Sequence, residues 1–99
     1  MTALANIHPG EVLLEDYLKP LEMSPERLAQ GLRIPVSEVE EILRGERAIT
    51  AAVALRLNRF FRASPEFWLN LQAAYDLEEE ELRRQDELAA IQPYQPSAA

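Results

Sequence analysis

Apolar residues recur along this chain three or four positions apart, which is the spacing of helices, and no stretch alternates in the way strands do. A first helix is predicted to start near Pro9, because proline suits the first turn of a helix. Pro20 should break or close this helix, since proline lacks the backbone N–H that continues it. Its inward positions are predicted to be Leu14, Leu18 and Leu21, with Val12 and Tyr17 nearby.

Two short helices are predicted on either side of Pro35. Ser24 can cap the free N–H groups of the first one, and Pro25 fits its first turn. Its inward face consists of Leu28, Ala29 and Leu32. Ser37 could cap the second helix, and Gly45 is a natural stop because glycine readily takes the left-handed conformation. The inward positions of this second helix are Val39, Ile42 and Leu43.

Two further helices are predicted in the second half of the chain. Thr50 caps the fourth helix, whose apolar positions include Val53, Leu57, Phe60 and Phe61. Ser64 and Pro65 repeat the cap-and-proline signal and open a fifth helix. Its apolar positions are Phe67, Trp68, Leu71, Tyr75 and Leu82. This helix can continue through Ala90, because the residues that follow are good helix formers.

The predicted fold is all-α, a single domain of five helices with an extended C-terminal helix. It should cover residues 1–91, and residues 92–99 should form a frayed tail. The chain has 99 residues and no cysteine, which excludes disulfides and thiolate metal sites. One histidine, His8, cannot build a metal site alone and is expected to cap or pack before the first helix. We expect no metal and no cofactor.

Apolar runs are too short to span a membrane, and the start of the chain lacks the features of a signal peptide, so we expect a cytoplasmic protein without membrane contact. The net charge is −7, which counts against nucleic-acid binding. The charge is uneven, however, with −1 on residues 1–63 and −6 on residues 64–99. The first part therefore stays available for DNA.

The helix pair at about residues 24–44 matches the spacing of a helix-turn-helix, in which the second helix enters the major groove of DNA. A plain helical bundle would share this spacing. The predicted DNA contacts are Ser37, Glu38, Glu40, Glu41, Arg44, Arg47 and Thr50. Arg44 and Arg47 are expected at phosphates, although cationic side chains also suit a helix C-terminus. Arg56, Arg59 and Arg62 could follow a phosphate backbone or pair with acidic residues of the last helix.

Three stretches carry a family likeness: HPGEVL at residues 8–13, ILRGERAIT at 42–50, and SPEFWLNLQAAYDL at 64–77. They resemble the HigA-type antitoxins, a branch of the repressor-like (XRE) helix-turn-helix family. The resemblance implies a homodimer that binds double-stranded operator DNA, represses its own operon and neutralises a HigB-type ribonuclease toxin. An enzyme is not expected, since the sequence has no nucleophile–base set, metal cluster or glycine-rich phosphate loop.

The chain departs from that family at the recognition helix. Glu38 and Glu40 stand where the family usually carries Arg and Asn, and Arg33 replaces the turn glycine. An antitoxin that has lost DNA binding and a solitary transcription regulator are therefore alternatives.

Two features of the last helix also have two interpretations each. The acidic run at 78–81 could clamp a basic toxin or form a solvated helix face. The dimer interface is predicted at Phe67, Trp68, Leu71 and Tyr75, with core packing as the alternative and the favoured one for Trp68.

Overall fold

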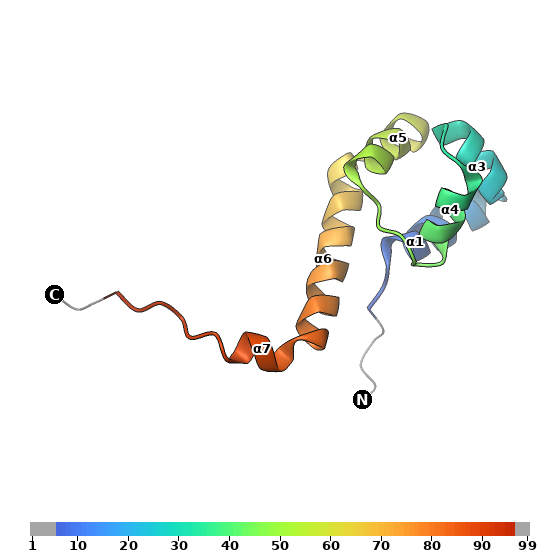
Figure 1. Ribbon diagram of the computed structural model, residues 1–99. Coiled ribbons are helices and arrows are strands. Elements are labelled where there is room, and N and C mark those ends of the chain that lie inside the picture. The colour runs from blue at the N-terminus through green and yellow to red at the C-terminus, as the bar shows by residue number, and fades with distance from the viewer. Residues whose placement is uncertain (1–5, 97–99) are drawn as a thin grey trace.

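The computed structural model describes residues 6–96, and all regular structure in that range is helical, as predicted. The elements are α1 (Pro9–Val12), the π-helical stretch η1 (Leu13–Leu18), α2 (Lys19–Leu21), α3 (Pro25–Leu32), α4 (Val36–Leu43), α5 (Ala51–Phe61), α6 (Pro65–Arg83) and α7 (Gln85–Ala89). The first three are continuous, so six helices replace the five expected. Figure 1 shows the helices up to α5 gathered at one end, with α6 leading away from them. Residues 1–5 and 97–99, which the predicted domain and tail include, lie outside the described residues.

The first helix ends at Leu21, one residue after Pro20, so Pro20 lies near its end, as predicted, and the helix is unbroken before it. A proline ring collides with the carbonyl four residues earlier in an ordinary α-helix. Here the preceding turns are widened into η1, in which the Lys19 N–H donates to the Leu14 carbonyl five residues back. The wider turns place Leu13 and Leu18 in the core, whereas Leu21 is exposed. The prediction that Leu21 faces inward is therefore wrong, and Leu13 takes the buried place instead.

Two of the four predicted serine and threonine caps form. The Ser24 hydroxyl accepts a hydrogen bond from the Arg27 N–H at 3.0 Å, and the Thr50 hydroxyl accepts one from the Val53 N–H at 3.4 Å. Ser37 is not a cap, because α4 already begins at the preceding residue, after Pro35. Proline at this position presets a backbone conformation from which the helix can start.

Ser64 also differs from the prediction in detail. The helix α6 opens at Pro65 as expected, but the Ser64 hydroxyl donates to a Glu66 carboxylate oxygen at 2.8 Å and leaves the backbone uncapped. This hydrogen bond lowers the pKa of Glu66. The start of α6 is thus set by proline rather than by a serine cap.

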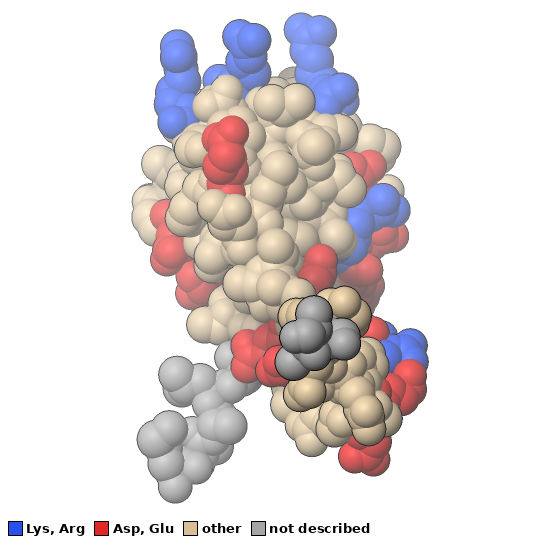
Figure 2. All heavy atoms as spheres, turned by 90° about the vertical axis from the view of Figure 1, so that its left-hand side faces the viewer, with Lys and Arg blue, Asp and Glu red and all other residues tan. Residues whose placement is uncertain are grey.

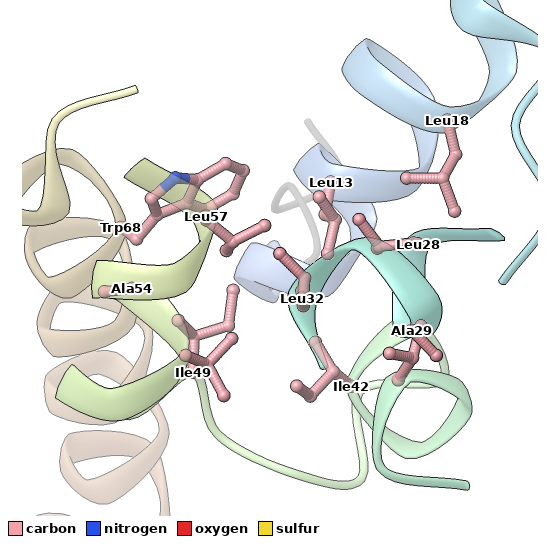
Figure 3. Packing of buried hydrophobic residues seen from close by; sticks show 12 residues of the cluster. Leu13, Leu18, Leu28, Ala29, Leu32, Ile42, Ile49, Ala54, Leu57 and Trp68 are labelled. Carbon is pink, nitrogen blue, oxygen red and sulfur yellow. The ribbon is translucent and has the colours of Figure 1, made fainter. Parts of the chain in front are cut away.

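The core lies where η1, α3, α4 and α5 meet the first turns of α6 (Figure 3). Its buried members include Leu13, Leu18, Leu28, Ala29, Leu32, Val39, Ile42, Ile49, Val53, Ala54, Leu57 and Trp68. Trp68 is the largest of them and is 0% exposed. Since α6 contributes this indole, the base of the C-terminal helix is part of the domain.

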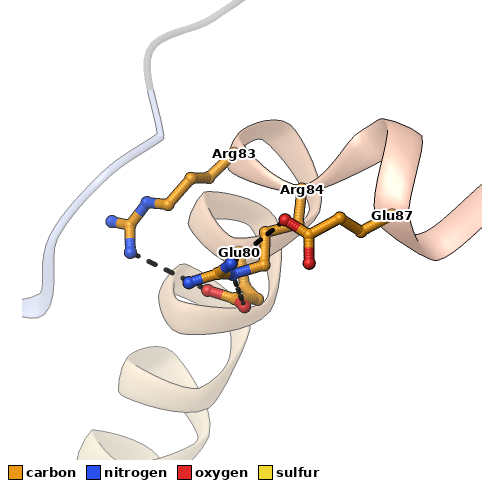
Figure 4. A network of polar contacts seen from close by, with 4 residues as sticks. All are labelled: Glu80, Arg83, Arg84 and Glu87. Carbon is orange, nitrogen blue, oxygen red and sulfur yellow. Dashed lines mark hydrogen bonds and ion pairs between the residues drawn. The ribbon is translucent and has the colours of Figure 1, made fainter.

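Beyond the core, the C-terminal part of α6 and α7 form an exposed arm, residues 77–91. The helix is interrupted at Arg84, whose backbone has φ −123° and ψ 32°. The helix predicted to continue through Ala90 is therefore divided into α6 and α7. Figure 4 shows the Arg84 guanidinium between Glu80 of α6, at 2.7 Å, and Glu87 of α7, at 3.2 Å. Leu82 belongs to α6, as predicted, and is 60% exposed. Residues 91–96 follow without regular structure.

Candidate nucleic-acid interface

The pair α3–α4 has the geometry of a helix-turn-helix. Arg33 ends α3 in the left-handed conformation, with φ 60° and ψ 46°. The Ile34 N–H then donates to the Ala29 carbonyl at 3.1 Å, which closes the end of α3. Val39 and Ile42 of α4 are buried in the core. The opposite side of α4 is consequently turned outward.

Gly10 allows α1 to pack directly against the C-terminal end of α4. A Cβ atom at this residue would lie 1.8 Å from the carbonyl oxygen of Ile42, which is backbone and cannot rotate away. Only glycine therefore allows α1 to approach the end of α4 this closely. The contact holds the C-terminal end of α4 against the first helix.

His8 supports the same region from the start of α1. Its Nδ1 accepts a hydrogen bond from the Gly10 N–H at 2.8 Å, so it is a cap, as predicted. Its ring meets the Tyr75 ring of α6 edge-on, with centroids 4.8 Å apart. Burial lowers the pKa of His8, although Asp76 and Glu11 oppose the shift. The imidazole thus joins α1 to α6 in its neutral form, since Nδ1 must be free to accept.

Gln72 joins α6 to the loop that follows α4, and the sequence interpretation missed this residue. Its side-chain oxygen accepts a hydrogen bond from the buried Ile49 N–H at 2.8 Å, and its nitrogen donates to Asp76 at 3.0 Å. Gln72 is only 7% exposed. A signal was present, because a glutamine four residues after Trp68 stands on the buried face of the helix. Such a polar group needs a partner inside the fold.

The predicted DNA contacts lie on α4 and the loop after it. Ser37 is exposed in the first turn of α4, and Glu38, Glu40 and Glu41 are half-buried. Thr50 stands at the end of the loop, where its hydroxyl caps α5.

Each of the two arginines expected at phosphates is paired with a neighbouring acid. Arg44 lies 3.2 Å from Glu46, and Arg47 lies 2.7 Å from Glu41. The hydrogen bond to Glu41 and the charge of that residue raise the pKa of Arg47. Both pairs are largely exposed, and exposed pairs are weak, so a phosphate group can replace the carboxylate.

A second group of arginines, which includes Arg27 of α3 and Arg56 of α5, lies at the end of the molecule formed by these two helices. In Figure 2 most blue side chains stand together at the top, above the tan body, and most red ones lie lower. Arg56 donates to the Leu32 carbonyl at 2.8 Å, and the Arg27 guanidinium lies 5.3 Å from the centre of the Phe60 ring. Within residues 6–96, the ion pairs of the C-terminal helix involve only its own arginines. The proposed pairing of α5 arginines with that helix therefore does not form within the chain.

The residues predicted for a dimer interface divide into two sets. Trp68 does not belong to a surface, because its indole is completely buried in the core. Phe67 is 42% exposed, whereas Leu71 and Tyr75 are half-buried on the same side of α6. Leu71 also packs against the core and Tyr75 against His8, so only the exposed parts of these three side chains are open to a contact between copies.

Together, the outward α4, its support by Gly10 and the arginine-bearing loop define a small helix-turn-helix protein. A family model described as helix-turn-helix matches residues 14–68. Virulence-associated protein I of Dichelobacter nodosus is 49% identical over 79 residues, which is 80% of this chain and 73% of that protein. The chain therefore belongs to the helix-turn-helix family.

Two solved structures extend the likeness through the C-terminal helix. An addiction module antidote protein of the HigA family from Coxiella burnetii is 44% identical, with a TM-score of 0.86 over 92% of this chain and 100% of that one. The Pseudomonas aeruginosa antitoxin HigA, solved with the higBA promoter, is 36% identical, with a TM-score of 0.88 over 92% of this chain and 100% of that one. The predicted resemblance to HigA-type antitoxins is confirmed. Among the residues that the structure describes, no helix is long and apolar enough to cross a membrane.

Proposed function

We propose that this protein is a HigA-type antitoxin, which represses its own operon and neutralises a HigB-type ribonuclease toxin. The observation that carries the proposal is the match, over nearly the whole chain, to an antitoxin HigA whose structure includes its promoter. The helix-turn-helix family consists of DNA-binding proteins rather than enzymes. We expect the protein to act in the cytoplasm, where the operator and the toxin are found.

Recognition of DNA starts with α4 in the major groove. Ser37 in its first turn can hydrogen-bond a base edge, and Glu38 can accept from the amino group of a cytosine. The acids beside them repel phosphates, so they restrict which positions along the groove α4 can occupy. A sequence with cytosine opposite Glu38 is favoured for this reason.

Phosphate contacts supply most of the affinity. Arg44 and Arg47 can release their carboxylate partners and turn to the DNA backbone. The free N–H groups at the start of α5, after Thr50, provide a further phosphate site of the kind that helix N-termini form. Gln72 keeps this loop in place through the Ile49 N–H.

A homodimer places two copies of α4 on the operator. Two-fold symmetry sets the recognition helices about 34 Å apart on successive turns of the groove. Phe67, Leu71 and Tyr75 of α6 form the proposed contact between the copies. Their position at the base of the arm leaves α4 free for DNA.

A titration with fluorescently labelled promoter DNA tests the repressor activity. We expect binding at physiological salt to the promoter of the protein's own operon, and much weaker binding to a scrambled duplex. Arg47→Ala should lower the slope of log affinity against log salt by about one, because one phosphate contact is lost. Lys19→Glu, which changes an exposed charge on α2, is the matched control.

Toxin neutralisation is tested by co-expression with the product of the adjacent open reading frame, which we expect to be a small basic toxin of the HigB type. We expect the two proteins to purify together and cell growth to be restored. Growth arrest that the full chain does not relieve would contradict the antitoxin function and leave DNA binding unaffected.

The acidic face of α4 supports a second candidate, an antitoxin that binds its toxin without binding DNA. In that case the wild-type protein leaves its promoter unbound, and Glu38→Arg combined with Glu40→Asn creates DNA binding. Specific binding by the wild-type protein at physiological salt contradicts this alternative.

A further inference from the structure

An open groove of about 580 Å³ lies between the end of α3 and the outer face of α5. Its floor is apolar and includes Gly31, Leu55 and Phe60, and its rim carries Arg33, Arg56 and Arg59. Leu55 is 57% exposed, although it belongs to a helix that buries three other residues. Gly31 allows the Phe60 ring of α5 to pack directly against α3, because a Cβ there would lie 2.5 Å from that ring.

The groove combines an apolar floor with arginine side chains that form no ion pair among the described residues. Within the described residues, the ion pairs of the chain lie elsewhere, at the loop after α4, on the first helix and on the arm. A nucleic acid would use the arginines but would leave Leu55 in water. A ligand that uses both features is an acidic segment with exposed apolar side chains.

The chain itself contains such a segment in the arm, residues 77–91. It carries six acidic residues and two arginines, a net charge of −4. Its exposed apolar side chains are Leu77, Leu82, Leu88 and Ile91. The arm therefore matches the groove in both charge and apolar character. Its four apolar side chains are exposed in its own protomer, and Glu79 accepts a hydrogen bond from Asn6 at 3.3 Å.

The arm cannot reach the groove of its own protomer. It continues α6 away from the α3–α5 end, and Figure 1 shows α7 at the opposite side of the molecule. A second copy of the chain can place its arm in the groove. In a two-fold symmetric dimer each protomer contributes one arm and one groove, so the same contact forms twice. Two grooves facing each other would instead bring Arg33, Arg56 and Arg59 against like charges.

We propose that the groove between α3 and α5 binds the acidic arm of a second copy of this chain. This inference rests on the homodimer of the proposed function and names a second contact within it, separate from Phe67, Leu71 and Tyr75. The dimer is then held by exchanged arms, and each protomer uses its arginine-rich end for its partner rather than for DNA.

Single cysteines test the contact directly, because the natural chain has none. Full-length Leu55→Cys and Leu82→Cys proteins are mixed, allowed to exchange subunits and mildly oxidised. We expect a disulfide-linked dimer from the mixture and little from either variant alone. Rapid linkage of Leu55→Cys with itself would mean that two α5 faces meet, and this result, like no linkage in the mixture, would overturn the proposal.

Charge reversal gives an independent test by sedimentation equilibrium. Arg33→Glu with Arg59→Glu should weaken the dimer at least tenfold, and so should Glu78→Arg with Glu81→Arg; the four changes together should restore it. Lys19→Glu is the control, and circular dichroism checks that each variant is folded. An unchanged dimer in the groove variant overturns the proposal without affecting the repressor, and unchanged mass with weaker promoter binding assigns the groove to DNA instead.

Discussion

Replacement of Gln72 by leucine tests whether α6 supports the loop next to the recognition helix. Leucine keeps most of the side-chain volume but accepts no hydrogen bond, so the buried Ile49 N–H loses its partner. An unsatisfied buried donor costs about 1–3 kcal/mol. We therefore expect Gln72→Leu to lower the free energy of unfolding by about 2 kcal/mol, which corresponds to a fall in Tm of roughly 8–16 °C in a domain of this size.

The assay is urea unfolding followed by the fluorescence of Trp68, which is the only tryptophan and is fully buried. Hydrogen exchange of the Ile49 amide gives a local measurement, and it should accelerate in the variant. Asp76→Ala is the matched control, because it removes the second hydrogen bond of Gln72 and leaves the bond to Ile49. A Gln72→Leu protein within about 0.5 kcal/mol of wild type, with the Ile49 amide still protected, would refute the reasoning.

Three further predictions concern the neighbouring residues. Gly10→Ala should destabilise the fold by about 3 kcal/mol, because its methyl group meets the Ile42 carbonyl; an unfolding midpoint equal to that of wild type contradicts this. The folded-state pKa of His8 is lowered, so its stabilising effect is present above the ordinary histidine pKa and is lost as the pH falls through the folded value. The His8→Asn variant keeps a capping side chain and should lose less stability than wild type between pH 7.5 and 5.5, and equal losses in denaturant titrations would argue against the assignment. Glu41→Gln should tighten promoter binding severalfold, because Arg47 loses its competing carboxylate; unchanged or weaker binding in the titration would show that Arg47 does not reach a phosphate.

Most of the fold could be predicted because its signals are local. Ser24 and Thr50 cap as expected, and Arg33 takes the left-handed conformation that its place after a short helix requires. The predictions failed where geometry depends on a neighbour. Pro20 lies at the end of the first helix, as predicted, but the π-helical stretch before it changes which leucines face the core, so that Leu13 is buried and Leu21 is exposed.

The site could be predicted only in part, for a similar reason. The outward residues of α4 follow from its periodicity, so Ser37 and the acids beside it were found. The supports of α4 come from distant parts of the sequence, since Gly10 meets Ile42 and Gln72 meets Ile49. No local pattern indicates such pairs, and the pairing of Arg47 with Glu41 likewise depends on how the loop turns after Gly45.

The most direct test of the account is hydroxyl-radical footprinting of the protein's own promoter by the full-length chain, alone and with the co-purified toxin. We expect two protected stretches, related by two-fold symmetry and centred about 34 Å apart, that disappear when Arg44 and Arg47 are both replaced by alanine. A promoter that stays unprotected under both conditions would contradict a DNA-binding antitoxin.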